Sequence, residues 1–322
     1  MSGRWLAGKA LAALLTLVFV IVFNFFLFRV MGDPTSQLVR IPNITQERLD
    51  AIAEDYGVDK PLPTQFVDYV GDTAQLDFGI SHRSRESVWT EILDALPWTL
   101  LLVGTGTLLA TLIGSWLGVV AATRRGRPTD NRLLGFSTFT YSAPEYWIGI
   151  ILILAFAWWV PILPAGQQVT PGIEFSGFIA EVLDVLEHLI LPATAITLML
   201  LGQYFLIMRS SMVDVLTEDF ITVKRATGLP WERVVRSHAV PNALLPLVTL
   251  SAIQFGIVVG GAITVETLFS WPGLGELTFN AINDKDFPVL QGTFLVFSAG
   301  VILANLLADC LYFYLDPRVQ AR

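Results

Sequence analysis

Residues 218–246 read EDFITVKRATGLPWERVVRSHAVPNALLP, and they form the longest polar interruption between the hydrophobic runs of the C-terminal half. Gly228 can end a short helix in a left-handed conformation at low steric cost, and Pro230 suits the first turn of a second helix. Four residues of that second helix recur at helical spacing: Trp231, Val234, Val235 and His238. The stretch therefore predicts two short amphipathic helices, one residue apart at a glycine, that form a docking platform on a membrane face. An ordinary amphipathic loop is the alternative.

The composition indicates an all-α polytopic membrane protein. Of its 322 residues, 53% are hydrophobic and only 15% are charged, whereas soluble domains carry about 25% charged residues. The net charge is −8, most of it in residues 32–97, which is not the balance of a nucleic-acid-binding protein. A single cysteine, Cys310, excludes an intrachain disulfide.

Six hydrophobic runs are long enough for transmembrane helices, which need about 20 residues each. They lie at about residues 10–31, 98–122, 133–160, 190–213, 243–268 and 289–315. The first run is longer than the core of a signal peptide, so we expect it to be retained. The predicted domains are an N-terminal helix (1–31), an acidic extracytoplasmic loop or small lid (32–97), and a five-helix core (98–316) that includes a cytoplasmic loop at 218–242.

Local signals refine these elements. Within the lid, a capped short helix is expected at 46–56 and a second amphipathic piece at 66–70. Pro144 should bend or break the third span. Glycines interrupt the leucines of the second span, which predicts close helix packing: Gly104, Gly106, Gly114 and Gly118.

The distribution of basic residues predicts the orientation. Placing the N-terminus inside puts thirteen Lys/Arg in the inside segments and six in the outside loops. Five of the thirteen lie in or just before the platform: Arg209, Lys224, Arg225, Arg233 and Arg236. Both termini and the platform are therefore expected to be cytoplasmic.

The sequence carries no legible catalytic chemistry. No phosphate-binding Gly-x-x-x-x-Gly-Lys-Ser/Thr loop occurs, so any ATP must be hydrolysed by another chain. The three histidines are far apart in sequence and do not indicate a metal site. Three ionisable residues in predicted spans are candidates for lining a translocation path: Glu145, Glu266 and Asp309.

The platform resembles the ATPase-docking loop of binding-protein-dependent ABC importer permeases, because Pro241 follows Gly228 by thirteen residues. Thr222-Val223-Lys224 departs from the general Glu-Ala-Ala motif. The dipeptide/oligopeptide/nickel branch is closer, and its pattern is matched by Phe220-Ile221, Arg225-Ala226, Gly228-Leu229, His238-Ala239 and Asn242-Ala243-Leu244-Leu245-Pro246. Further matches extend the resemblance over residues 32–318, among them Gly32-Asp33-Pro34, Asp59-Lys60-Pro61-Leu62, Pro272-Gly273-Leu274-Gly275 and Leu315-Asp316-Pro317-Arg318.

This resemblance implies a type I importer permease fold, of the kind with an extended first extracytoplasmic loop, in the plasma membrane. It implies a homologous permease as partner in a heterodimer, two cytoplasmic ATP-binding subunits that use ATP, an extracytoplasmic solute-binding protein, and no cofactor on this chain. ATPase docking is expected at Phe220, Arg225, Ala226, Gly228, Leu229, His238 and Pro241. The expected substrates are dipeptides or oligopeptides, with oligosaccharides and nickel complexes as alternatives. An ion-coupled secondary carrier or channel, or a non-transporting membrane scaffold, remains possible from the residues alone.

Overall fold

The computed structural model describes residues 3–30, 60–244, 246–247, 250–251 and 262–315. These residues form helices and one isolated antiparallel bridge between Ile80 and Ser87, with no β-strand among them. The expected all-α class is therefore confirmed for the described part of the chain.

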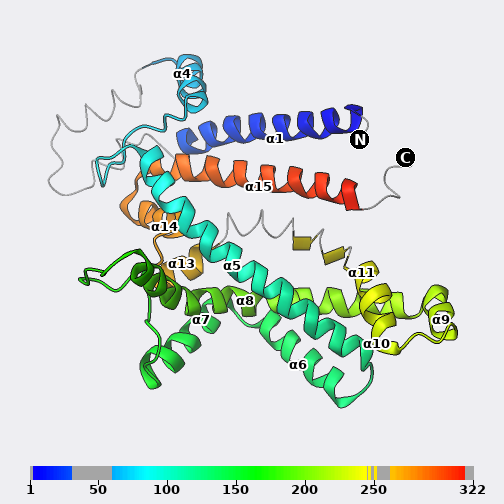
Figure 1. The fold of residues 1–322 in the computed structure, drawn as a ribbon. Coiled ribbons are helices and arrows are strands. Elements are labelled where there is room, and N and C mark those ends of the chain that lie inside the picture. Colours follow the sequence, from blue (N-terminus) through cyan, green and yellow to red (C-terminus); the bar gives the residue numbers. More distant parts are fainter. Residues whose placement is uncertain (1–2, 31–59, 245, 248–249, 252–261, 316–322) are drawn as a thin grey trace.

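Long helices dominate the structure (Figure 1). They are α1 (Gly3–Val30), α5 (Val88–Thr123), α8 (Phe178–Leu216) and α15 (Phe287–Leu315), together with the bent pair of α6 (Pro128–Ser142) and α7 (Glu145–Ile153), which a π-helical turn η1 (Leu154–Trp159) extends. In the described residues, four helices are long and apolar enough to cross a membrane, or five if the bent pair is one span. Shorter helices are α4 (Leu62–Ala74), α9 (Asp219–Ala226), α10 (Trp231–Val234), η2 (Val235–Ala239), α11 (Val240–Ala243), α13 (Ile263–Phe269) and α14 (Leu274–Asp284).

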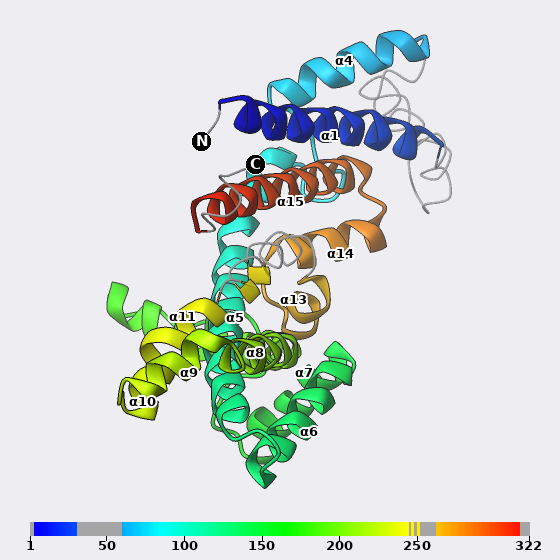
Figure 2. The ribbon, with the colours of Figure 1, turned by 90° about the vertical axis from the view of Figure 1, so that its right-hand side faces the viewer.

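Helices α5 and α8 pack against each other at the centre of the molecule. On one side α6 and α7 pack on α8, and on the other α15 packs on α5 and is covered by α1 (Figures 1 and 2). The large buried cluster that holds α5 and α8 together includes Leu102, Ile196 and Tyr204.

Small residues permit the close approach of α5 to α8, as expected. A Cβ added to Gly114 would lie 2.8 Å from the Tyr204 Cβ, and one added to Gly118 would lie 2.7 Å from the Met208 Cβ. No larger residue fits there without displacing a helix. Gly104 differs, because an added Cβ would meet nothing within 4 Å.

The predicted break at Pro144 is confirmed. Helix α6 ends at Ser142, Ala143 is extended at φ −72° and ψ 135°, and α7 begins at Glu145 at 102° to α6. A proline disfavours helical backbone in the residue before it, which explains why α6 stops there. We call residues 143–145 the elbow.

Two helices begin before the membrane spans expected in them. α5 begins at Val88, so the expected domain boundary at 97/98, which stays a prediction, falls inside a helix, with Pro97 in its interior. α8 begins at Phe178 rather than near residue 190. Hydropathy marks where apolar residues begin, whereas a helix continues into polar sequence as long as its backbone hydrogen bonds do. The first turns of α8 mix the acids Glu181, Asp184 and Glu187 with apolar residues, and these acids kept the expected span from starting there.

Two other predictions fall on residues that the structure does not describe. The expected helix at 46–56 lies wholly outside the described residues, and the expected fifth span at 243–268 lies largely outside them. The amphipathic piece expected at 66–70 is part of α4, which is longer at 13 residues.

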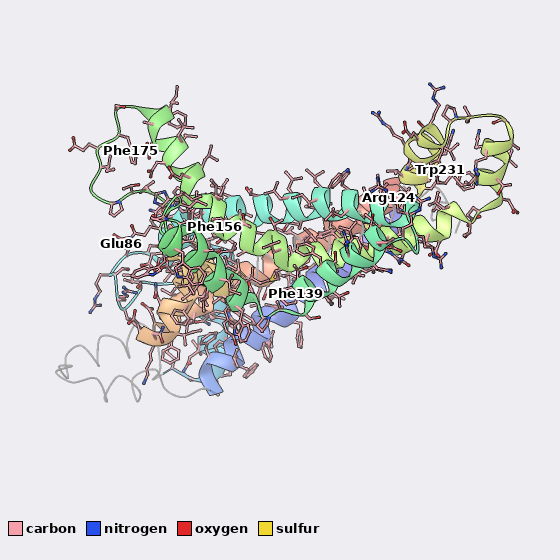
Figure 3. The ribbon with its side chains drawn as sticks, turned by 90° about the horizontal axis from the view of Figure 1, so that it is seen from below. Glu86, Arg124, Phe139, Phe156, Phe175 and Trp231 are labelled. Atoms are coloured by element: carbon pink, nitrogen blue, oxygen red, sulfur yellow. The ribbon has the colours of Figure 1, made fainter. Side chains whose placement is uncertain are left out.

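The two ends of the molecule hold different helices and loops. The first turn of α1, the last turn of α15 and the helices α9 and α10 lie at one end (Figure 1). Figure 3 shows Arg124 and Trp231 together at this end, and Glu86 and Phe175 at the other. We call the first the platform end.

Candidate functional site

The platform comprises α9, α10, η2 and α11, which follow one another directly after α8. Gly228 has φ +82°, and its N–H donates to the Arg225 carbonyl at 3.0 Å, so it ends α9 in the left-handed conformation expected of it. Pro230 directly precedes α10. The two helices are separated by the four residues 227–230, and the predicted separation of one residue is wrong.

The inner face of the platform is anchored on α8. Ile221, Val234 and Ala239 are buried in one cluster with Met208 and Met212 of α8. At the far end of the platform, the Ser211 hydroxyl of α8 donates to the Ala243 carbonyl at 3.0 Å. A displacement of the platform must therefore move the end of α8 or break these contacts.

The outer face of the platform is apolar and basic. Phe220, Val223 and Trp231 are 37%, 59% and 42% exposed. The Arg225 guanidinium lies 5.3 Å from the centre of the Trp231 ring, a cation–π contact that joins α9 to α10 across the Gly228 turn. Exposed aromatic and arginine side chains on a rigid support are typical of protein-binding surfaces.

The structure divides the seven residues predicted for docking between two environments. Four of them are exposed on α9 or the turn after it: Phe220, Arg225, Ala226 and Gly228. Pro241 is also exposed, in the first turn of α11. Leu229 and His238 are half-buried, and Leu229 packs against the main cluster. Sequence reasoning missed Val223 as a surface residue; its position two residues before Arg225 on an amphipathic helix was the available signal.

Arg209, which we counted among the basic residues of the platform, is engaged inside the protein. Its Nε and Nη2 donate to the two carboxylate oxygens of Asp130 at 2.6 and 2.8 Å. The Asp130 side chain is 1% exposed, and its Oδ2 also accepts from the Gly126 N–H at 2.9 Å. Nothing in the sequence indicated this contact between residues 79 positions apart.

The three residues predicted to line a path lie in three different places. Glu145 is half-buried at the elbow. Asp309 of α15 forms an ion pair with Lys9 of α1 at 2.7 Å, with both side chains about 40% exposed. Glu266 is 0% exposed within this chain. Whether they line a path remains a prediction.

Glu266 holds the start of α14. Its carboxylate accepts from the Thr99 hydroxyl at 2.8 Å and from the N–H groups of Gly275 and Glu276 at 2.6 and 3.1 Å. The Thr99 hydroxyl oxygen accepts in turn from the Leu274 N–H at 2.8 Å. A carboxylate at a helix N-terminus satisfies N–H groups that have no partner in the helix. These contacts fasten α14 to α5.

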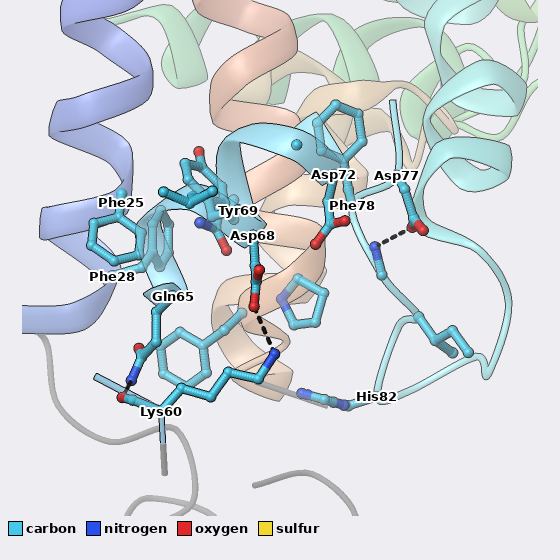
Figure 4. A pocket seen from close by; sticks show the side chains of 17 residues that line it. Phe25, Phe28, Lys60, Gln65, Asp68, Tyr69, Asp72, Asp77, Phe78 and His82 are labelled. Atoms are coloured by element: carbon cyan, nitrogen blue, oxygen red, sulfur yellow. Dashed lines mark hydrogen bonds and ion pairs between the residues drawn. The ribbon is translucent and has the colours of Figure 1, made fainter. Parts of the chain in front are cut away.

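A cavity of about 730 Å³ lies near the end opposite the platform, between α1, α4, α15 and the turn at 77–82 (Figure 4). Phe25, Phe28 and Phe78 form apolar walls. Its polar side chains include Lys60 and Asp68, paired at 2.6 Å, and Asp77, which accepts from the Gly79 N–H at 3.0 Å.

Two families of known proteins together match most of the chain. Residues 114–321 match the family described as binding-protein-dependent transport system inner membrane component, and residues 3–103 match the N-terminal family of such membrane components. The Pseudomonas aeruginosa di/tripeptide transport system permease protein DppB is 36% identical over 315 residues, which cover 94% of each chain. The Escherichia coli dipeptide transport system permease protein DppB is 35% identical over 311 residues, which cover 92% of each chain.

A solved structure is also similar. An inward-facing form of the MetNI methionine ABC transporter matches with a TM-score of 0.55 and 16% identity, over 70% of this chain and 96% of that chain. At this identity the likeness shows a shared fold and nothing about the substrate.

Proposed function

This chain belongs to the family of inner membrane components of binding-protein-dependent transport systems, and we propose that it is the permease subunit of an ATP-driven peptide importer. In this role it forms one half of a translocation path, and a second, homologous permease forms the other. Two ATP-binding subunits dock on the permeases from the cytoplasm, and a solute-binding protein delivers the substrate from outside.

The observation that carries this proposal is the platform. Its inner face is fastened to α8 by buried side chains and its outer face presents Phe220, Val223, Trp231 and Arg225 to a partner. A chain that lacks a phosphate-binding loop needs such a surface to receive mechanical work from an ATPase. Movement of the platform is passed directly to α8, which packs on α5, α6 and α7.

The orientation proposed is cytoplasmic for both termini, with six spans in all. It is supported by the excess of basic residues in the segments then placed inside. It is also supported by the common position of the first turn of α1, the last turn of α15 and the platform (Figure 1). The described residues hold five candidate spans when the bent pair is counted as one, and the expected fifth span at 243–268, much of which lies outside the described residues, would be the sixth.

The proposed substrates are dipeptides or oligopeptides, on the strength of two relatives whose names state di/tripeptide or dipeptide transport. Selection among solutes is expected to rest on the solute-binding protein, which is a separate chain. Oligosaccharides and nickel complexes remain the alternatives within the family.

The test is purification of this permease in detergent, followed by identification of the chains that accompany it. We expect an ATPase to copurify, and we expect uptake of a radiolabelled dipeptide by proteoliposomes to stop when that ATPase is inactivated. Uptake driven by an ion gradient in the absence of any ATPase would instead identify an ion-coupled secondary carrier and refute the proposal.

A further inference from the structure

Asp130 and Arg209 form the most deeply buried ion pair that the structure shows among the described Lys/Arg–Asp/Glu pairs. Two hydrogen bonds, at 2.6 and 2.8 Å, join the Arg209 guanidinium to both carboxylate oxygens of Asp130, which is a bidentate contact. Asp130 is 1% exposed and Arg209 is 22% exposed. We call this contact the fork.

The fork joins three segments at the platform end of the molecule. Asp130 lies in the first turn of α6 and Arg209 near the end of α8. The Gly126 N–H, in the turn between α5 and α6, donates to the same carboxylate at 2.9 Å, and Gly126 has φ +77°. The end of α5, the start of α6 and the end of α8 are therefore held by one carboxylate.

The platform is attached to α8 next to the fork. Ser211, two residues after Arg209, donates to the Ala243 carbonyl, while Met208 and Met212 of α8 share the buried cluster that contains Ile221. Because these contacts lie within one helical turn of Arg209 on α8, a displacement of the platform also moves Arg209.

At its other end α6 leads into the elbow. About two turns before Arg209, Gly202 of α8 lies against α6, so closely that an added Cβ would meet the Ser137 carbonyl oxygen and lie 2.7 Å from the Tyr141 Cβ. Held by the fork at its start and by this contact near its end, α6 must follow α8 as one body. The elbow, with its 102° bend and the half-buried Glu145, is the next element along the chain.

We infer that the Asp130–Arg209 fork is a positioning device that couples displacement of the docking platform to the α6–α7 elbow. This inference rests on the proposed function. A fork suits the task because two parallel bonds set an angle as well as a distance, whereas a lysine would supply only a point charge. A buried ion pair contributes little net stability compared with an apolar pair of the same size, so stability alone does not account for it.

The test uses the complete importer, with its ATPases and solute-binding protein, in proteoliposomes. Coupling is measured as ATP hydrolysis in the presence of solute-binding protein and dialanine divided by hydrolysis without them, per amount of assembled complex. Uptake of radiolabelled dialanine per ATP is the second readout. The variants are Arg209→Lys, Asp130→Asn and the double change Asp130→Leu with Arg209→Met.

We expect both single variants to retain basal ATP hydrolysis on the partner chains while coupling falls about tenfold. Because the single changes leave a buried charge unpaired, they can lower the amount of complex. The apolar double variant should restore that amount and remain uncoupled. Arg83→Gln, which removes the exposed ion pair to Asp284, is the control and should couple normally.

Two results would overturn the inference alone: unchanged coupling in both single variants, or full coupling in the apolar double variant. A wild-type complex without any ATP-dependent uptake would refute the proposed function itself, and the inference with it. The two failures are distinguishable because only the second is seen in the unmodified protein.

Discussion

Replacing Gly228 by valine tests the platform most directly. Gly228 has φ +82°, and a Cβ added there would meet nothing within 4 Å. The effect of valine is therefore confined to the backbone, because no neighbouring side chain is displaced. A β-branched residue in the left-handed region costs about 1–3 kcal/mol, enough for the turn to adopt another conformation.

A rearranged turn would separate the two halves of the docking surface. The Gly228 N–H would leave the Arg225 carbonyl, and the Arg225 guanidinium would no longer lie 5.3 Å from the Trp231 ring centre. The inner anchors on α8 do not involve the turn, so we expect the protein to insert and fold. ATPase docking should weaken by about the same 1–3 kcal/mol, or roughly 5- to 150-fold in affinity.

The assay is copurification of the ATPase, together with stimulation of its ATP hydrolysis by the loaded solute-binding protein. Gly172→Val is the matched control, because Gly172 has φ +78°, equally open surroundings and a position away from the platform. Gly228→Asn should retain most of the coupling, since asparagine tolerates the left-handed conformation. Normal docking and stimulation in Gly228→Val would refute the assignment of the platform.

Three further substitutions test the fold. Gly114→Ala places a Cβ 2.8 Å from the Tyr204 Cβ and should destabilise the protein in detergent by about 1–3 kcal/mol. The control is Gly104→Ala, which adds a Cβ in open space on the same helix and should not destabilise the protein. Equal melting temperatures for the two variants would contradict the packing argument. Glu266→Gln replaces the carboxylate that accepts from the N–H groups at the start of α14 by an amide, which has only one acceptor oxygen. The free energy of unfolding should fall by about 1–3 kcal/mol, which a lower melting temperature would show. Burial, with repulsion from two neighbouring aspartates, raises the pKa of the Asp72 carboxyl above its usual value. The folded state therefore binds the proton more tightly than the unfolded state, and Asp72→Asn should slightly raise the melting temperature at pH 7. Well below pH 3.8 the carboxyl is protonated in both states, so the substitution should have no effect there. A higher melting temperature at that pH would show that the charge of Asp72 is not the reason for the gain.

Local chemistry was legible in the sequence. The break at Pro144 and the left-handed turn at Gly228 depend on the backbone preferences of a few adjacent residues, and both are as expected. The glycines of α5 indicated close packing because small residues in an apolar helix have few other uses, although the sequence did not separate Gly104 from Gly114. The family, too, was identifiable from ordered motifs.

Tertiary structure decided the contacts between distant residues and the ends of the long helices. Glu266 of α13 meets Thr99 of α5 across 167 positions because α14, which packs on α13, also packs on α5. Arg209 meets Asp130 across 79 positions because α6 packs on α8. α5 and α8 begin ten or more residues before the spans expected in them, since the hydrogen bonds of a helix continue past the residues that set its hydropathy. Periodicity and composition describe how each residue meets its near neighbours or a membrane, and they carry no information about which helix faces which.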